Sequence, residues 1–166
     1  MASTGRNLFA SLPPPAECLA LLIGTAELTI FGLSGLFSPP TLATGFGLPL
    51  LPASSLQKHP GALESSSPEE SAHAKKIENQ QKAMVMALAA RNVQNGILLL
   101  TFGAWFRDRK ALAVIVATGV VTTATDYLVV KAYGVKEAAG GHLIGVFNCL
   151  LVGGSLFWWG RNDPWW

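Results

Sequence analysis

The chain has 166 residues, a formal net charge of +2, 50% hydrophobic residues and only 13% charged residues. Soluble domains carry about 25% charged residues, so this composition, together with long apolar stretches, indicates an integral membrane protein. The small charge without a long basic run argues against a nucleic-acid partner, and two cysteines, Cys18 and Cys149, are too few for a disulfide framework or a thiolate metal site.

The first apolar segment spans residues 17–37 and follows three prolines at positions 13–15, which block a helix from extending backwards. A helix needs about 20 apolar residues to cross the hydrocarbon core, so this segment predicts a transmembrane helix. Its length, Glu27 within it and the lack of a small-residue cleavage site favour a retained helix over a cleaved signal peptide.

The stretch that follows has two parts of different character. Residues 38–52 are apolar and rich in Pro and Gly, which predicts a lipid-facing or re-entrant turn. Residues 53–76 are mostly Ser, Pro, Glu and Lys, with too few apolar groups to order themselves. We therefore expect a flexible polar loop insertion here, in which His59 and His73 have no role.

Three further apolar segments cover residues 80–106, 111–134 and 142–160. The sequence thus predicts an all-α fold, a single antiparallel up-down four-helix transmembrane bundle with a partly disordered loop between its first two helices. The second and third helices are joined only by 107-RDRK-110, which requires a hairpin and whose three cations favour the cytoplasmic side. In a eukaryote we expect the endoplasmic reticulum or another internal membrane.

Arg91 lies in the middle of the second segment, where a charge costs roughly 2.5–3.5 kcal/mol on insertion scales. It must therefore find a partner inside the bundle. Arg91 lies 16 residues before Arg107, and Asp126 lies 16 residues after Lys110, so antiparallel helices place the two groups at nearly one depth. We predict a bidentate ion pair between Arg91 and Asp126.

The same counting along the first and fourth segments places Glu27 and Asn148 at this level of the bilayer. Small and hydroxyl residues share their helix faces, so these groups are expected to point inward, around a cavity or a packed polar core. One arginine neutralises one carboxylate, so one of the two acids is expected to stay protonated. Besides the arginine at its depth, Asp126 has the hydroxyl groups of Thr122 and Thr123 on its own helix face. Glu27 has the apolar Ala20, Gly24 and Phe31 about it, which favours the protonated form and makes Glu27 the predicted proton donor.

Five features occur in a recognisable order: 46-FGLP-49, 90-ARNVQNG-96, 107-RDRKALA-113, Asp126 and 140-GGHLIG-145. Together they resemble the DUF4267 family over roughly residues 20–160, apart from the polar insertion. The resemblance implies a small four-helix membrane protein, from a family frequent in fungi and bacteria that has no well-defined common activity. It also implies that an Arg, an Asp and a His recur at the positions of Arg91, Asp126 and His142.

The candidate catalytic residues are therefore Glu27, Arg91, Asp126 and His142, and the candidate substrate-binding residues are Gln94, Asn95, Thr122 and Asn148. Each group has a structural alternative. The ion pair could fix helix register, Glu27 could be a protonated acid bonded to a neighbouring helix, His142 could cap the fourth helix at the membrane edge, and the amides could join helices.

Two classes of function remain open. The first is an enzyme that uses acid–base chemistry, without a cofactor or metal, for isomerisation, cyclisation or epoxide opening of a lipophilic small molecule. By analogy alone, it would serve a fungal secondary-metabolite pathway. The second is a non-catalytic subunit, scaffold or lipid-binding protein; a transporter is less favoured, because internal repeats are missing. Expected partners are the substrate, membrane lipids, and either a second copy or a pathway enzyme.

Overall fold

The computed structural model describes residues 14–52, 55 and 68–158. Its first spanning element is a helix of three joined parts. These parts are α1 (Pro15–Ala26), the π-helix η1 (Glu27–Leu33) and α2 (Ser34–Phe37). The short helix α3 (Pro39–Phe46) follows, so the expected re-entrant turn contains a helix. A π-helix has one more residue per hydrogen-bonded turn than an α-helix and often lies at a functional site.

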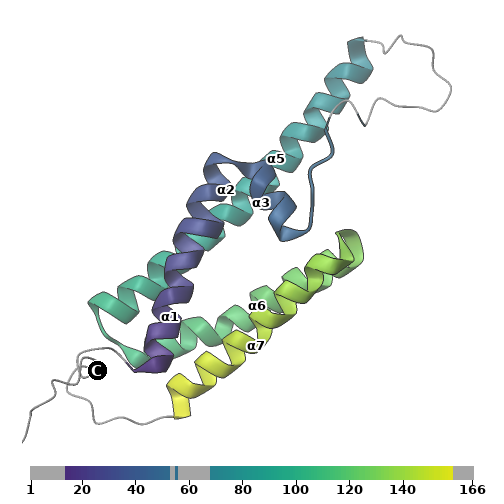
Figure 1. Cartoon of the computed structure of the whole chain (residues 1–166). Helices are drawn as coiled ribbons and strands as arrows, with labels where there is room; N and C mark the ends of the chain where they lie inside the picture. Colours follow the sequence, from purple (N-terminus) through teal and green to yellow (C-terminus); the bar gives the residue numbers. More distant parts are fainter. Residues whose placement is uncertain (1–13, 53–54, 56–67, 159–166) are drawn as a thin grey trace, which may run out of the picture.

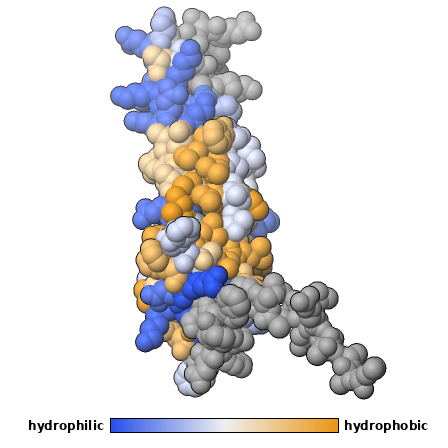
Figure 2. All heavy atoms as spheres, turned by 90° about the vertical axis from the view of Figure 1, so that its left-hand side faces the viewer, coloured by the Kyte–Doolittle hydropathy of each residue, from blue (hydrophilic) through white to orange (hydrophobic). Residues whose placement is uncertain are grey.

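The second spanning element is α5 (Pro68–Leu100), which continues into a second π-helix, η2 (Thr101–Trp105). The third and fourth are α6 (Arg109–Tyr133) and α7 (Lys136–Trp158). All four are long and apolar enough to cross a membrane, which makes this a multi-pass membrane protein. Figure 2 shows the corresponding apolar band between two polar zones. The predicted all-α transmembrane bundle is confirmed.

Local sequence explains where the helices begin and end. Pro15 and Pro39 stand in the first turns of α1 and α3, where a missing N–H costs nothing. Gly47, with a φ of 90°, ends α3 in the left-handed conformation. The Asp108 side chain accepts a hydrogen bond from the Ala111 backbone N–H at 3.0 Å and so caps α6.

The polar insertion is shorter than the sequence predicts. Residues 68–76, expected to belong to a flexible loop, form the first turns of α5, and His73 is therefore helical. The reason is local: this stretch is rich in Ala, Glu and Lys, which are good helix formers, and Glu69 and Glu70 favour the helix N-terminus. Residues 53–54 and 56–67, with His59, lie outside the described part of the chain.

The helices form two hairpins (Figure 1). In the first, α1 and η1 pack closely on α5, because glycines face one another: a Cβ at Gly96 would lie 2.6 Å from the Leu28 backbone nitrogen and 2.7 Å from the Gly24 carbonyl oxygen. In the second, α6 and α7 pack along their length, and Gly153 lies against the Ala117 backbone.

The hairpins meet at one end and diverge towards the other, as Figure 1 shows. Where they meet, a buried cluster joins them, made of Ala20, Leu99, Leu112, Ala113, Val116, Val152 and Leu156. At the other end the turn after α3 bridges them: the Val135 N–H donates to the Gly47 carbonyl oxygen at 2.8 Å. The space between the hairpins is thus bounded at both ends.

Candidate functional site

The space between the hairpins holds two adjoining cavities of about 130 and 240 Å³. The smaller lies between α5 and α6, and the larger is lined by residues of every spanning helix and of α3. Five side chains line both and are named here the polar centre: Glu27, Arg91, Asn92, Thr123 and Asp126. Groups from η1, α5 and α6 therefore meet at one level of the bundle.

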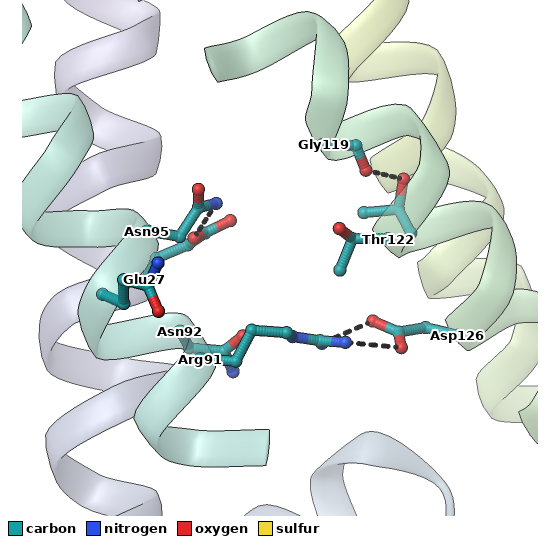
Figure 3. Close-up of a pocket in the computed structure, with 9 residues that line it drawn as sticks. Glu27, Arg91, Asn92, Asn95, Gly119, Thr122 and Asp126 are labelled. Carbon is teal, nitrogen blue, oxygen red and sulfur yellow. Dashed lines mark hydrogen bonds and ion pairs between the residues drawn. The ribbon is translucent and has the colours of Figure 1, made fainter. Parts of the chain in front are cut away.

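The predicted contact between Arg91 and Asp126 is confirmed. The guanidinium donates from Nη2 to Oδ2 at 2.9 Å and from Nη1 to Oδ1 at 3.3 Å, in the bidentate arrangement. Figure 3 shows the two side chains reaching towards each other from α5 and α6 across the space between the hairpins. The ion pair therefore ties the first hairpin to the second within the membrane-spanning helices.

Removing either member of this pair should destabilise the protein, and removing both should cost less than the sum of the two single changes. We expect Arg91→Met or Asp126→Asn to cost about 3 kcal/mol each, because the remaining charge is left unpaired in an apolar surrounding. The double variant should cost less than the sum, with a coupling energy of about 1–3 kcal/mol. Unfolding by a denaturing detergent measures all four proteins, and strict additivity would contradict the contact.

Glu27 is the first residue of η1, and its carboxyl group faces the polar centre. Its Oε2 accepts a hydrogen bond from the Asn95 Nδ2 at 2.5 Å. Within the described residues Glu27 makes no ion pair, since the guanidinium of Arg91 is engaged by Asp126. With all three charged, this level would carry a net −1; protonation of Glu27 would make it neutral. That protonation state stays a prediction.

His142 lies farther inside the bundle than the sequence predicts, because α7 begins at Lys136 and not at the histidine. Its Nε2 is 2.9 Å from the Phe46 carbonyl oxygen, and its ring meets the Phe46 ring edge-on at 4.4 Å between centroids. A carbonyl oxygen only accepts, so Nε2 bears the hydrogen. His142 therefore satisfies the last carbonyl of α3 and also lines the larger cavity.

The predicted substrate-binding residues take different positions. Asn95 is engaged by Glu27, whereas Gln94 and Thr122 line the smaller cavity and Asn148 lines the larger one. Among the described residues, the side chains of Gln94, Thr122 and Asn148 have no hydrogen-bond partner. Polar groups at this depth are costly unless something pairs with them. They are therefore available to water or to a ligand.

A family model described as "Domain of unknown function (DUF4267)" matches residues 25–156, which is most of the chain. The chain belongs to the DUF4267 family. The predicted membership is confirmed, and every predicted site residue lies in the matched region. No curated protein and no solved structure matches the chain. Because this description assigns no activity, the function of this DUF4267 protein has to be argued from its site.

Sequence reasoning missed a second ion pair, outside the cavity. Glu17 is fully buried, and its Oε1 lies 3.1 Å from the Arg109 Nε. The Arg109 Nη2 also donates to the Ser155 carbonyl oxygen at 3.2 Å, so α1, α6 and α7 are joined where the hairpins meet. The sequence contained a signal: in an up-down bundle, the start of the first helix and the RDRK link lie on the same membrane side.

Three further residues line the cavities although the sequence did not mark them as candidate binding residues. Asn92 belongs to the polar centre, and Phe46 and Cys149 line the larger cavity. The Asn92 amide, on the same helix as Gln94 and Asn95, joins no helices, since its side chain has no hydrogen-bond partner in the part of the chain that is described. The FGLP motif could have indicated Phe46, since its glycine and proline mark a turn near the polar residues.

Over residues 14–52, 55 and 68–158, no group of three His, Cys, Asp or Glu side chains could hold a metal ion.

Proposed function

We propose that this protein catalyses acid–base chemistry on a lipophilic small molecule within the membrane. The observation that supports the proposal most is the pairing of the two carboxyl groups of the polar centre. Asp126 is held by the Arg91 guanidinium, whereas Glu27 is held by the neutral Asn95 amide. The amide N–H of Asn95 brings no positive charge, so only Asp126 has a cation beside it, and burial without a cation favours the protonated form of Glu27. One ionised and one protonated carboxyl group side by side are the arrangement that acid–base catalysis needs.

The roles follow from these contacts. Glu27 donates a proton to an oxygen or a double bond of the substrate, and it recovers the proton when the product forms. The ionised Asp126, oriented by Arg91, stabilises the positive charge that develops on the protonated substrate. Isomerisation, cyclisation and the opening of an epoxide by an internal double bond or hydroxyl all fit: protonation starts the reaction, the internal group forms the new bond as the old one breaks, and loss of a proton completes it. His142, whose ring lines the larger cavity, passes protons between the cavity and water.

The apolar lining of the larger cavity supports a lipophilic substrate. Ile23, Phe31 and Phe46 line it beside the polar centre, with Asn148 as a hydrogen-bonding group that is not otherwise engaged. Its volume of about 240 Å³ is somewhat below the range of about 300–1,000 Å³ usual for ligand pockets. A small molecule, or one end of a longer one, fits this space. A place in a secondary-metabolite pathway remains part of the proposal.

A non-catalytic role is the second candidate, favoured by a specific observation. Both hydrogen-bonded pairs of the site join different helices: Arg91 to Asp126 links α5 with α6, and Asn95 to Glu27 links α5 with η1. Such pairs would also specify the packing of a scaffold or lipid-binding protein. The two candidate functions predict different turnover for a variant in which residue 27 keeps its shape but has no acidic proton to donate.

Glu27→Gln is expected to lower turnover by about 10²- to 10⁴-fold, the usual contribution of a positioned acid, while the protein still folds. Glutamine retains the oxygen that accepts from Asn95. Mass spectrometry of metabolites from cells that express the wild type or the variant should show a precursor that accumulates only with Glu27→Gln. Glu137→Gln, an exposed acid in the first turn of α7, is the matched control. Full turnover by Glu27→Gln would contradict the proton-donor role and favour the non-catalytic packing role.

A further inference from the structure

The polar centre opens on two sides of the bundle, and the two sides differ in chemistry. The side between α5 and α6 presents polar groups, among them Asn95 and Thr122 (Figure 3), and Gln94 lines the cavity there as well. The side between the first spanning helix and α7 presents apolar groups, chiefly Ile23 of α1 and Phe31 of η1. The second opening is named here the apolar mouth. A ligand that reaches the polar centre through it must first contact hydrocarbon side chains.

The apolar mouth is wide because α7 has small residues there. Gly141 and Gly145 both line the larger cavity. A Cβ at Gly145 would lie 3.3 Å from the Thr123 methyl group, whereas a Cβ at Gly141 would have no atom within 4 Å. The space beside Gly141 is therefore open and leads towards the polar centre.

The apolar mouth faces lipid and not water. Phe31, which lines it on η1, is a large apolar side chain exposed on the surface of the bundle. The exposed Ile30 precedes Phe31 in η1, and the exposed Ile144 precedes the cavity-lining Gly145 in α7. All three lie within helices long and apolar enough to cross the membrane. A molecule that enters here comes from the hydrocarbon core.

We propose that the ligand of this site is a membrane-dissolved, uncharged lipophile with one hydrogen-bonding oxygen, and that it enters laterally through the apolar mouth. A charged group would have to cross hydrocarbon at a cost of several kcal/mol, which excludes it from this route. The hydrogen-bonding oxygen follows from the lining: Asn92 and Asn148 line the larger cavity without partners and Glu27 faces the same space, so an oxygen on the ligand would pair with groups that are otherwise left to water. The inference rests on the proposed function only for the reaction at the oxygen.

Photo-crosslinking tests this route without any catalytic step. The full chain in lipid nanodiscs is irradiated with a long-chain alcohol that bears a diazirine next to its hydroxyl group, and the modified residues are identified by mass spectrometry. We expect crosslinks at the cavity residues Glu27, Asn148 and Cys149, in clear excess over the exposed, lipid-facing Val121. The same chain ending in a quaternary ammonium group should not label the cavity above the level at Val121.

Gly141→Trp should reduce cavity labelling about tenfold, equivalent to losing about 1.4 kcal/mol of binding free energy, because the indole extends into the mouth from a position where a Cβ would meet no atom within 4 Å. Gly140→Trp is the matched control: it is the neighbouring residue of α7, its Cβ would also meet nothing within 4 Å, and it does not line the cavity. Gly140→Trp should label like the wild type.

Equal cavity labelling in Gly141→Trp and Gly140→Trp, better labelling by the ammonium probe, or cavity labelling no stronger than at Val121 would each overturn lateral entry of an uncharged lipophile. Glu27→Gln separates this inference from the proposed chemistry. Persistent labelling of Asn148 and Cys149 with full turnover in that variant would refute the proton-donor role and leave the binding route intact.

Discussion

Replacing Arg109 with methionine is expected to destabilise the protein by about 3–5 kcal/mol, because it leaves the fully buried Glu17 carboxylate without its cation. The Nε and Oε1 atoms are 3.1 Å apart but not aligned as a hydrogen bond, so the attraction is mainly Coulombic. The same change also removes the donor to the Ser155 carbonyl oxygen on α7. All these contacts lie where the two hairpins meet, so the loss should loosen the bundle as a whole.

Unfolding by a denaturing detergent measures this loss, with Lys110→Met as the control because Lys110 is the exposed neighbouring cation. The control should change the unfolding free energy by no more than about 0.5 kcal/mol, as for ordinary surface substitutions. Adding Glu17→Gln to Arg109→Met should restore part of the stability, because the unpaired charge is then gone. An Arg109→Met protein as stable as Lys110→Met would show that the buried pair contributes nothing.

Gly96→Leu should have the second large effect, a loss of about 3 kcal/mol or more, at or above the upper end for an overpacked core. A Cβ at Gly96 would lie 2.6 Å from the Leu28 nitrogen and 2.7 Å from the Gly24 oxygen, and these backbone atoms cannot move unless η1 and α1 separate from α5. Separation would also pull Glu27 away from Asn95. Gly96→Leu should therefore lower the stability of the fold and also disrupt the polar centre.

The control for this change is Gly154→Leu on α7, where a Cβ would have no atom within 4 Å. Because both are glycine-to-leucine changes within helices, they share the gain in helix propensity, and only the steric term differs. Gly154→Leu should match or slightly exceed the wild type in stability. If Gly96→Leu unfolds at the same detergent concentration as Gly154→Leu, α5 and η1 do not pack as closely as the structure indicates.

The four spanning helices and the depth of the polar groups followed from the sequence alone. Both are local properties, because the apolar length of a segment decides whether it can cross the membrane and a constant rise of about 1.5 Å per residue sets the depth of each side chain. This is why Arg91 and Asp126 could be paired from their distances to the RDRK link. The helical start of α5 was also a local property, but the charged composition of residues 68–76 was interpreted as a loop.

Only the tertiary structure decided which side chains are neighbours around the bundle. The direction in which a side chain points depends on the rotation of its helix and on the angle between the hairpins. The extra residue in each turn of η1 shifts that rotation beside Glu27. The bond from Asn95 to Glu27, the bond from His142 to Phe46 and the buried pair of Glu17 with Arg109 all depend on these angles. The depth of a side chain in the membrane is fixed by its position along its own helix. The neighbour that the side chain faces is decided only when the helices pack against one another.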